Sequence, residues 1–120
     1  MEQQNNSINK EQLEGAKAIL KQRFPIMIEG YIEDVMMYLE SIQEGLTQRD
    51  LEQVSFNAHT MKSASSGLGI VKVADLAKEI EKLSKTNDNT DKVIELVEQL
   101  QQEVEAVIPE LTRFASNSEG

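Results

Sequence analysis

The 120-residue sequence contains no cysteine and a single histidine, His59. The lack of cysteine excludes disulfide scaffolds, thiolate metal sites and cysteine nucleophiles, and one histidine gives no basis for a histidine-rich metal site. Basic residues are scarce as well, since 12 Lys and Arg stand against 21 Asp and Glu for a net charge of -9. Sequence-independent binding of nucleic acid needs cations that displace phosphate counterions, so we expect no nucleic-acid partner.

Long apolar runs are also missing. No uninterrupted apolar stretch approaches the roughly 20 residues of a membrane span, and the first six residues lack the basic and apolar regions of a signal peptide. The hydrophobic fraction of 39% is nevertheless too high for a disordered chain. We therefore expect one cytoplasmic domain over residues 1–120, ordered from about residue 8 to about residue 115, with no membrane partner.

The periodicity that is present is helical. Apolar or small residues recur at intervals of three and four in four successive segments. The four stripes are Ile28, Ile32, Val35, Leu39, Ile42 and Leu46; Leu51, Val54, Ala58, Met61, Ser65 and Leu68; Val73, Leu76, Ile80 and Leu83; and Val93, Val97, Leu100, Val104, Val107 and Leu111. They predict an all-α fold, an antiparallel four-helix bundle with a short additional N-terminal helix. Because the apolar faces of the four helices pack against one another in such a bundle, little apolar surface is left for a dimer interface, and we expect a monomer.

Capping signals mark several helix ends. Asn9 and Asp50 are expected to cap the N-terminal helix and the helix that contains His59, each with a glutamine three residues later to complete a capping box. Gly69 suits the left-handed conformation that often ends a helix. Pro109 lies inside the last stripe, which predicts a kink or a break near Ile108.

His59 is the residue that stands out chemically. At about 100° per residue it points roughly 130° away from the centre of the apolar stripe of its helix, on or near the solvent side. Ser55, Lys62, Ser63 and Ser66 follow at i-4, i+3, i+4 and i+7 and share its face. We therefore expect the imidazole to be surrounded by one ammonium group and small hydroxyl side chains, with nothing acidic over it in that turn.

This environment suits phosphoryl transfer. The neutral imidazole of an exposed histidine is a competent nucleophile near neutral pH, and an ammonium group one turn away suits the charge of a transferring phosphoryl group. A surface histidine with a lysine at i+3 is common, however, and alone indicates no function. The sequence has no glycine-rich loop followed by Lys-Ser/Thr and no kinase nucleotide-binding motif, so we expect no ATP site.

The longer string Ala58-His59-Thr60-Met61-Lys62-Ser63-Ala64-Ser65-Ser66-Gly67-Leu68-Gly69 resembles the signature of histidine-containing phosphotransfer (HPt) domains. In that family the phosphorylated histidine is followed by Lys or Arg at i+3, a small residue at i+4 and Gly at i+10. The matching residues here are Lys62, Ser63 and Gly69. Ser63 departs from the commoner glycine but adds only a hydroxymethyl group. HPt domains are four-helix bundles of this size, so the resemblance extends over the chain.

The resemblance implies a phosphoryl carrier of a multistep phosphorelay rather than an enzyme. His59 would accept a phosphoryl group, through Nε2, from the aspartate of a response-regulator receiver domain and pass it to the aspartate of another. Lys62 would stabilise the phosphoryl oxygens, and Ser63 would leave the approach open. The expected partners are receiver domains and a hybrid sensor histidine kinase. No cofactor of its own is expected, because the partner receiver domain would supply Mg²⁺.

Helical geometry adds three candidates to this site. Ser66 shares the face of His59 and is a candidate hydrogen-bond donor. Phe56 falls off the core stripe and is predicted to dock a partner together with Ser55. Gly69 is expected to be structural.

Two alternatives remain open at the level of sequence. In the first, an HPt-like bundle binds a receiver or a kinase without being phosphorylated. In the second, the chain is the phosphoacceptor domain of a chemotaxis-type histidine kinase, which shares a similar His-x-x-Lys string.

Overall fold

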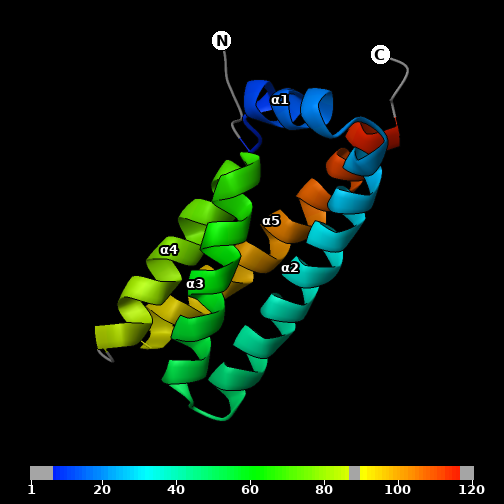
Figure 1. The fold of residues 1–120 in the computed structure, drawn as a ribbon. Helices are drawn as coiled ribbons and strands as arrows, with labels where there is room; N and C mark the ends of the chain where they lie inside the picture. The colour runs from blue at the N-terminus through cyan, green and yellow to red at the C-terminus, as the bar shows by residue number, and fades with distance from the viewer. Residues whose placement is uncertain (1–6, 87–89, 117–120) are drawn as a thin grey trace.

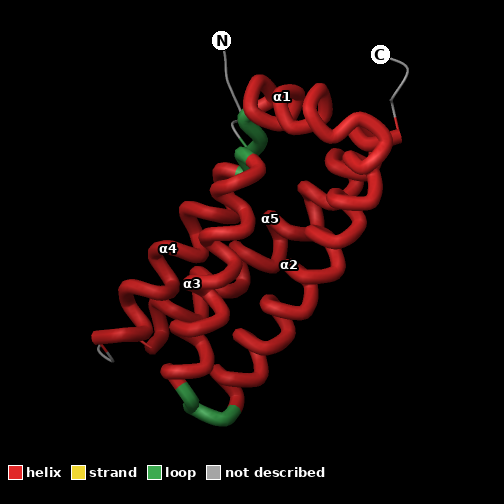
Figure 2. Tube along the Cα trace, viewed as in Figure 1, coloured by secondary structure: helices red, strands yellow, loops and turns green. Residues whose placement is uncertain are grey.

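The fold is seen in a computed structural model that describes residues 7–86 and 90–116. Its helices are α1 (Lys10–Leu20), the short 3-10 helix η1 (Lys21–Arg23), α2 (Phe24–Thr47), α3 (Leu51–Leu68), α4 (Val71–Thr86) and α5 (Thr90–Ser116). The described ranges contain no strand, only an isolated bridge between Ile8 and Ile70 (Figure 2). None of the helices in these ranges combines the length and the apolar character that a membrane span requires.

Helices α2 to α5 form the bundle. Each packs against the next, and α5 closes the bundle by packing against α2 (Figure 1). Successive helices run in opposite directions, and α1 lies across the end of the bundle where α2 begins and α5 ends. The predicted antiparallel four-helix bundle with a short N-terminal helix is confirmed.

The core contains one face of each bundle helix, and α4 differs most from its predicted stripe. Its buried residues are Val73, Ala74, Ala77, Ile80, Glu81 and Ser84. The predicted Leu76 and Leu83 are only partly buried at the edge of the core. Small side chains on this face bring the backbone of α4 close to α3, and they place one carboxylate, that of Glu81, inside the contact.

Residues of the N-terminal segment, Asn9 and Gln12, form hydrogen bonds with the C-terminal end of α3. Asn9 caps α1 as predicted, since its Oδ1 accepts a hydrogen bond from the backbone N–H of Gln12 at 3.1 Å. The capping box does not form, because the Gln12 side chain donates to the carbonyls of Ser66 and Gly67, at 3.0 Å each. Gly69 has the predicted left-handed conformation, with φ 79°. The segment thus satisfies carbonyl groups that the end of α3 leaves open.

The start of α3 follows the same pattern. Asp50 is the N-cap, and its Oδ1 accepts a hydrogen bond from the backbone N–H of Gln53 at 3.1 Å. The Gln53 side chain donates to the carbonyl of Ser41 in α2 at 3.0 Å. The predicted cap is therefore confirmed and the predicted capping box is wrong, because the glutamine binds the neighbouring helix.

Pro109 does not break α5. The helix continues through it to Ser116, so of the kink or break predicted near Ile108 the break does not occur, while the kink stays a prediction. A proline inside a helix costs about 3 kcal/mol, whereas burial of each large apolar side chain contributes about 1.5–3 kcal/mol. Val107 and Leu111 are both buried on either side of the proline, and their packing offsets its cost.

Candidate functional site

His59 projects from the middle of α3 into solvent. Its side chain is 57% exposed, while Ala58 and Met61 on the other side of the helix are buried in the core. This confirms the orientation that the spacing of the apolar stripe predicted.

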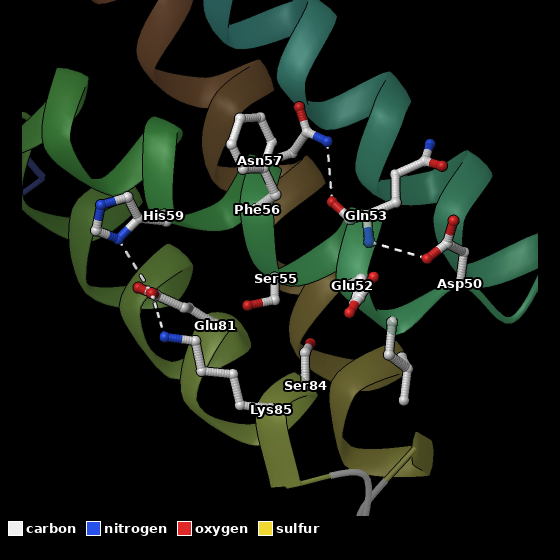
Figure 3. A pocket seen from close by; sticks show the side chains of 11 residues that line it. Asp50, Glu52, Gln53, Ser55, Phe56, Asn57, His59, Glu81, Ser84 and Lys85 are labelled. Carbon is white, nitrogen blue, oxygen red and sulfur yellow. Dashed lines mark hydrogen bonds and ion pairs between the residues drawn. The ribbon is translucent and has the colours of Figure 1, made fainter.

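Glu81 of α4 lies beside the His59 ring (Figure 3). Its Oε2 is 3.0 Å from Nδ1 of His59, and its side chain is only 11% exposed. The expectation of surroundings without an acidic group is correct for α3 alone and wrong for the folded protein. The second helix supplies a carboxylate that the helical projection of α3 cannot contain.

Two lysines complete the cluster around this carboxylate. Oε1 of Glu81 lies 3.3 Å from Nζ of Lys62, and Oε2 lies 3.1 Å from Nζ of Lys85, one turn further along α4. Burial of the Glu81 carboxyl acts to raise its pKa, but hydrogen bonds from Lys85, Lys62 and His59 outweigh burial and lower the pKa below its usual value. The group is therefore ionised at neutral pH.

The charge of Glu81 determines which nitrogen of His59 carries the proton. An ionised carboxylate only accepts hydrogen bonds, so Nδ1 of His59 is the donor in the 3.0 Å contact. In the neutral ring, Nε2 then keeps its lone pair. A carboxylate in this position also stabilises positive charge that develops on the ring when the other nitrogen attacks an electrophile.

An open groove of about 980 Å³ lies beside His59, between the first half of α3 and the second half of α4 (Figure 3). It is lined by Asp50, Leu51, Glu52, Gln53, Ser55, Phe56, Asn57, His59, Glu81, Ser84 and Lys85. Phe56 is 71% exposed and Ser55 is half-buried. Both predicted docking residues thus lie at the surface next to His59.

Within residues 7–86 and 90–116, no group of three or more His, Cys, Asp or Glu side chains is arranged to hold a metal ion.

The remaining predicted residues lie further along the same face. Ser63 is exposed one turn after His59, and Ser66 is exposed two turns after it, about 10 Å along the helix axis. Lys62 is brought together with His59 through their shared partner Glu81. In the described parts of the chain, no hydrogen bond joins the hydroxyl of Ser63 or Ser66 to the ring, so the predicted role of Ser66 stays a prediction.

Glu81 and Lys85 are the site residues that the sequence analysis missed. A signal for Glu81 was present: it follows Ala77 by four residues and Ala74 by seven, on the same face of α4. A carboxylate among small residues on an inward face needs a partner on the helix opposite. Lys85 then follows at i+4, in position for an ion pair along the helix.

Comparison with known proteins identifies the family. Residues 26–109, from the first turn of α2 to near the end of α5, match the family model of the Hpt domain. The chain belongs to the Hpt domain family. Members of this family are phosphoryl carriers of phosphorelays that interact with response-regulator receivers and with kinases, and this Hpt domain is accordingly a histidine phosphotransfer module.

The Hpt domain fold extends beyond the matched residues. The chain is similar to the crystal structure of histidine-containing phosphotransfer protein B (HptB) from Pseudomonas aeruginosa PAO1, with a TM-score of 0.89 over 95% of this chain and 98% of that one. The two sequences are 20% identical, so this similarity establishes a common fold. No curated protein matches the sequence of this Hpt domain.

Proposed function

We propose that this Hpt domain accepts a phosphoryl group on Nε2 of His59 from the aspartyl phosphate of one receiver domain and passes it to the aspartate of another. The observation that supports the proposal best is the contact between Nδ1 of His59 and the Glu81 carboxylate, 3.0 Å long. It leaves Nε2 as the nucleophilic nitrogen on a ring that is more than half exposed.

The transfer step follows from this arrangement. The lone pair of Nε2 forms the N–P bond while the bond between phosphorus and the aspartyl oxygen breaks, and the aspartate leaves as a carboxylate with the electron pair. Nδ1 keeps its proton, so the ring gains positive charge next to Glu81, which stabilises it. Lys62, one turn from His59, balances the charge of the phosphoryl oxygens. The second transfer runs the same step in reverse.

The surface around the ring fits a partner that must bring its own active site close. Ser63 is small and exposed, so it leaves the approach to Nε2 open. Phe56 offers a large apolar side chain to the partner, and burial of such a side chain is typical of the residues that dominate interface energy. Ser55 contributes to the same surface, whereas Gly69 shapes the end of α3. The Mg²⁺ ion of the reaction is proposed to arrive with the receiver.

The test is phosphoryl transfer from a receiver domain loaded with labelled phosphate. We expect an acid-labile, alkali-stable label on the wild type and none on His59→Gln. Glu33→Gln, an exposed change on α2 outside the groove, is the matched control and should accept label like the wild type. In the same assay at limiting receiver concentration, Phe56→Ala should slow transfer through weaker docking.

Other outcomes favour the remaining alternatives. If no receiver in a panel labels the wild type in the presence of Mg²⁺, the domain is a binding module without phosphorylation. Label that requires an ATP-binding kinase domain in trans indicates the phosphoacceptor domain of a chemotaxis-type kinase. Label on His59→Gln places the phosphoryl group on another residue.

A further inference from the structure

Before any phosphoryl group arrives, Lys62 already has a partner. Its Nζ lies 3.3 Å from Oε1 of Glu81, the longest of the three contacts on this carboxylate. A phosphoryl group on Nε2 of His59 would bring close to two negative charges next to the same ammonium group. Because Lys62 uses the carboxylate oxygen that His59 does not, it can turn to the phosphoryl group without disturbing the contact with the ring.

The departure of Lys62 leaves Glu81 in need of another cation. With one cation fewer beside it, the carboxylate is held less firmly against the ring and is free to turn towards solvent. Lys85 prevents this, because its Nζ lies 3.1 Å from Oε2, the oxygen that also accepts from Nδ1 of His59. The pair is built within one helix, at i and i+4, so it does not depend on α3.

We propose that Lys85 is a positioning residue for phosphoryl transfer: it keeps Glu81 ionised and directed at Nδ1 of His59 while Lys62 moves to the phosphoryl group. This inference rests on the proposed function and adds a residue to it. It makes Lys62 the mobile cation of the site and Lys85 the stationary one.

Charge balance in the phosphorylated state supports the same assignment. The phosphoryl group carries about two negative charges and Glu81 carries a third. The protonated ring, Lys62 and Lys85 together supply three positive charges, so the cluster is close to neutral. Without Lys85 the cluster would hold one uncompensated negative charge, which destabilises the phosphorylated state relative to the free histidine.

The experiment compares Lys85→Gln with two matched variants. Lys82→Gln removes an exposed lysine of the same helix that belongs to none of the ion pairs seen in the described residues, and Lys85→Arg keeps the charge. Each protein is phosphorylated with phosphoramidate, a small-molecule donor, and the lifetime of the phosphohistidine is followed by ³¹P NMR. Because His59 is the single histidine, ¹⁵N NMR reports the proton on its Nδ1 without overlap.

We expect Lys85→Gln to shorten the lifetime of the phosphohistidine roughly two- to fivefold, as an ion pair at a partly exposed site allows. In the unphosphorylated protein, the share of rings with the proton on Nε2 should rise in ¹⁵N NMR, because Glu81 is then held less firmly against Nδ1. Lys85→Arg should restore both properties, and Lys82→Gln should behave like the wild type. In a Glu81→Gln background the same change at Lys85 should have no further effect, because Lys85 acts through Glu81.

Three results would overturn the inference: a lifetime that Lys85→Gln leaves unchanged, an equal loss in Lys82→Gln, or an equal loss in the Glu81→Gln background. Each leaves the proposed function intact. Failure of the wild type to form a phosphohistidine with phosphoramidate or with any receiver would instead contradict the proposed function. Lys85 is 64% exposed and Lys82 is exposed as well, so changes at these two lysines are not expected to disturb folding.

Discussion

Two of the polar contacts between helix α3 and its neighbours differ strongly in charge and in exposure. Towards α2, the hydroxyl of Tyr31 and the Oγ of Ser65 are 2.7 Å apart, and both residues are buried. Towards α4, the carboxylate of Glu81 contacts a histidine and a lysine of α3 and a lysine of its own helix. The first contact is neutral and closed to solvent, whereas the second is charged and includes a ring that is 57% exposed.

The difference between the two contacts predicts that one affects mainly the stability of the protein and the other mainly the reactivity of His59. A buried hydrogen bond between neutral groups contributes about 1 kcal/mol, and leaving one partner unsatisfied costs about 1–3 kcal/mol. Ion pairs near the surface contribute about 0–1 kcal/mol, because solvent and side-chain entropy offset the attraction. We therefore expect the contact with α2 to determine how firmly α3 is held, and the contact with α4 to determine what His59 can do.

The largest expected effect on stability is the alkaline titration of Tyr31. Burial raises its pKa to about 12, although the hydrogen bond with Ser65 acts in the opposite direction. In the unfolded chain tyrosine ionises near pH 10, so this stabilisation is fully present below pH 10 and is lost as the pH rises towards about 12, a loss of about 3 kcal/mol over the window. Urea unfolding between pH 9 and pH 12 measures it.

The control for this titration is Tyr31→Phe, which cannot ionise. Its free energy of unfolding should fall less steeply with pH than that of the wild type, so the two curves should converge above pH 10. Parallel curves would show that other groups cause the alkaline loss and would contradict the role given to Tyr31.

At neutral pH, Tyr31→Phe itself has the next largest effect. The change leaves the Ser65 hydroxyl buried without its partner, so we expect the free energy of unfolding to fall by about 1–2 kcal/mol. Transfer to His59 should be unchanged, because Tyr31 touches the opposite flank of α3. Urea unfolding and the receiver assay measure the two quantities.

Removal of both hydroxyls tests the reason for this loss. Tyr31→Phe combined with Ser65→Ala should recover part of the stability, since no unpaired group is then buried. If the double variant is less stable by the sum of two full losses, the hydrogen bond is not the source of the effect. A change in transfer rate would show that the two flanks of α3 are coupled.

The two contacts of α3 also show what the sequence predicts and why. Helix boundaries at Asn9, Asp50 and Gly69 depend on backbone conformation and on side chains within a few residues, so local patterns predict them. The same holds for the exposed orientation of His59, which follows from the apolar stripe of one helix. These features need no knowledge of the neighbouring helices.

What could not be predicted depends on the register between helices. The sequence predicts local capping boxes at Gln12 and Gln53, but each side chain donates to a backbone carbonyl of another helix. Glu81 is 22 residues from His59 in sequence, and only the packing of α4 on α3 brings the two together. A helical projection describes one helix at a time, so it cannot contain such a contact.

The smallest expected effect on stability comes from Glu81→Gln, which removes the charge of the contact with α4 and keeps its shape. At pH 7 we expect a change of less than about 1 kcal/mol in the free energy of unfolding, because the partners are partly exposed. The glutamine amide can donate or accept a hydrogen bond, so it can pair with Nδ1 of His59 whether or not Nδ1 carries the proton. The share of rings with the proton on Nε2 should rise in ¹⁵N NMR, and transfer from a receiver should fall about tenfold or more.

The dependence on pH separates this variant from a merely structural one. Because the pKa of Glu81 is lowered in the folded protein, its contribution is present above the pKa of an unfolded glutamate and is lost as the pH falls through the lowered value. The difference in stability between wild type and Glu81→Gln should therefore disappear in acid. A large stability loss at pH 7 with normal transfer would reverse the comparison, making the contact with α4 the structural one.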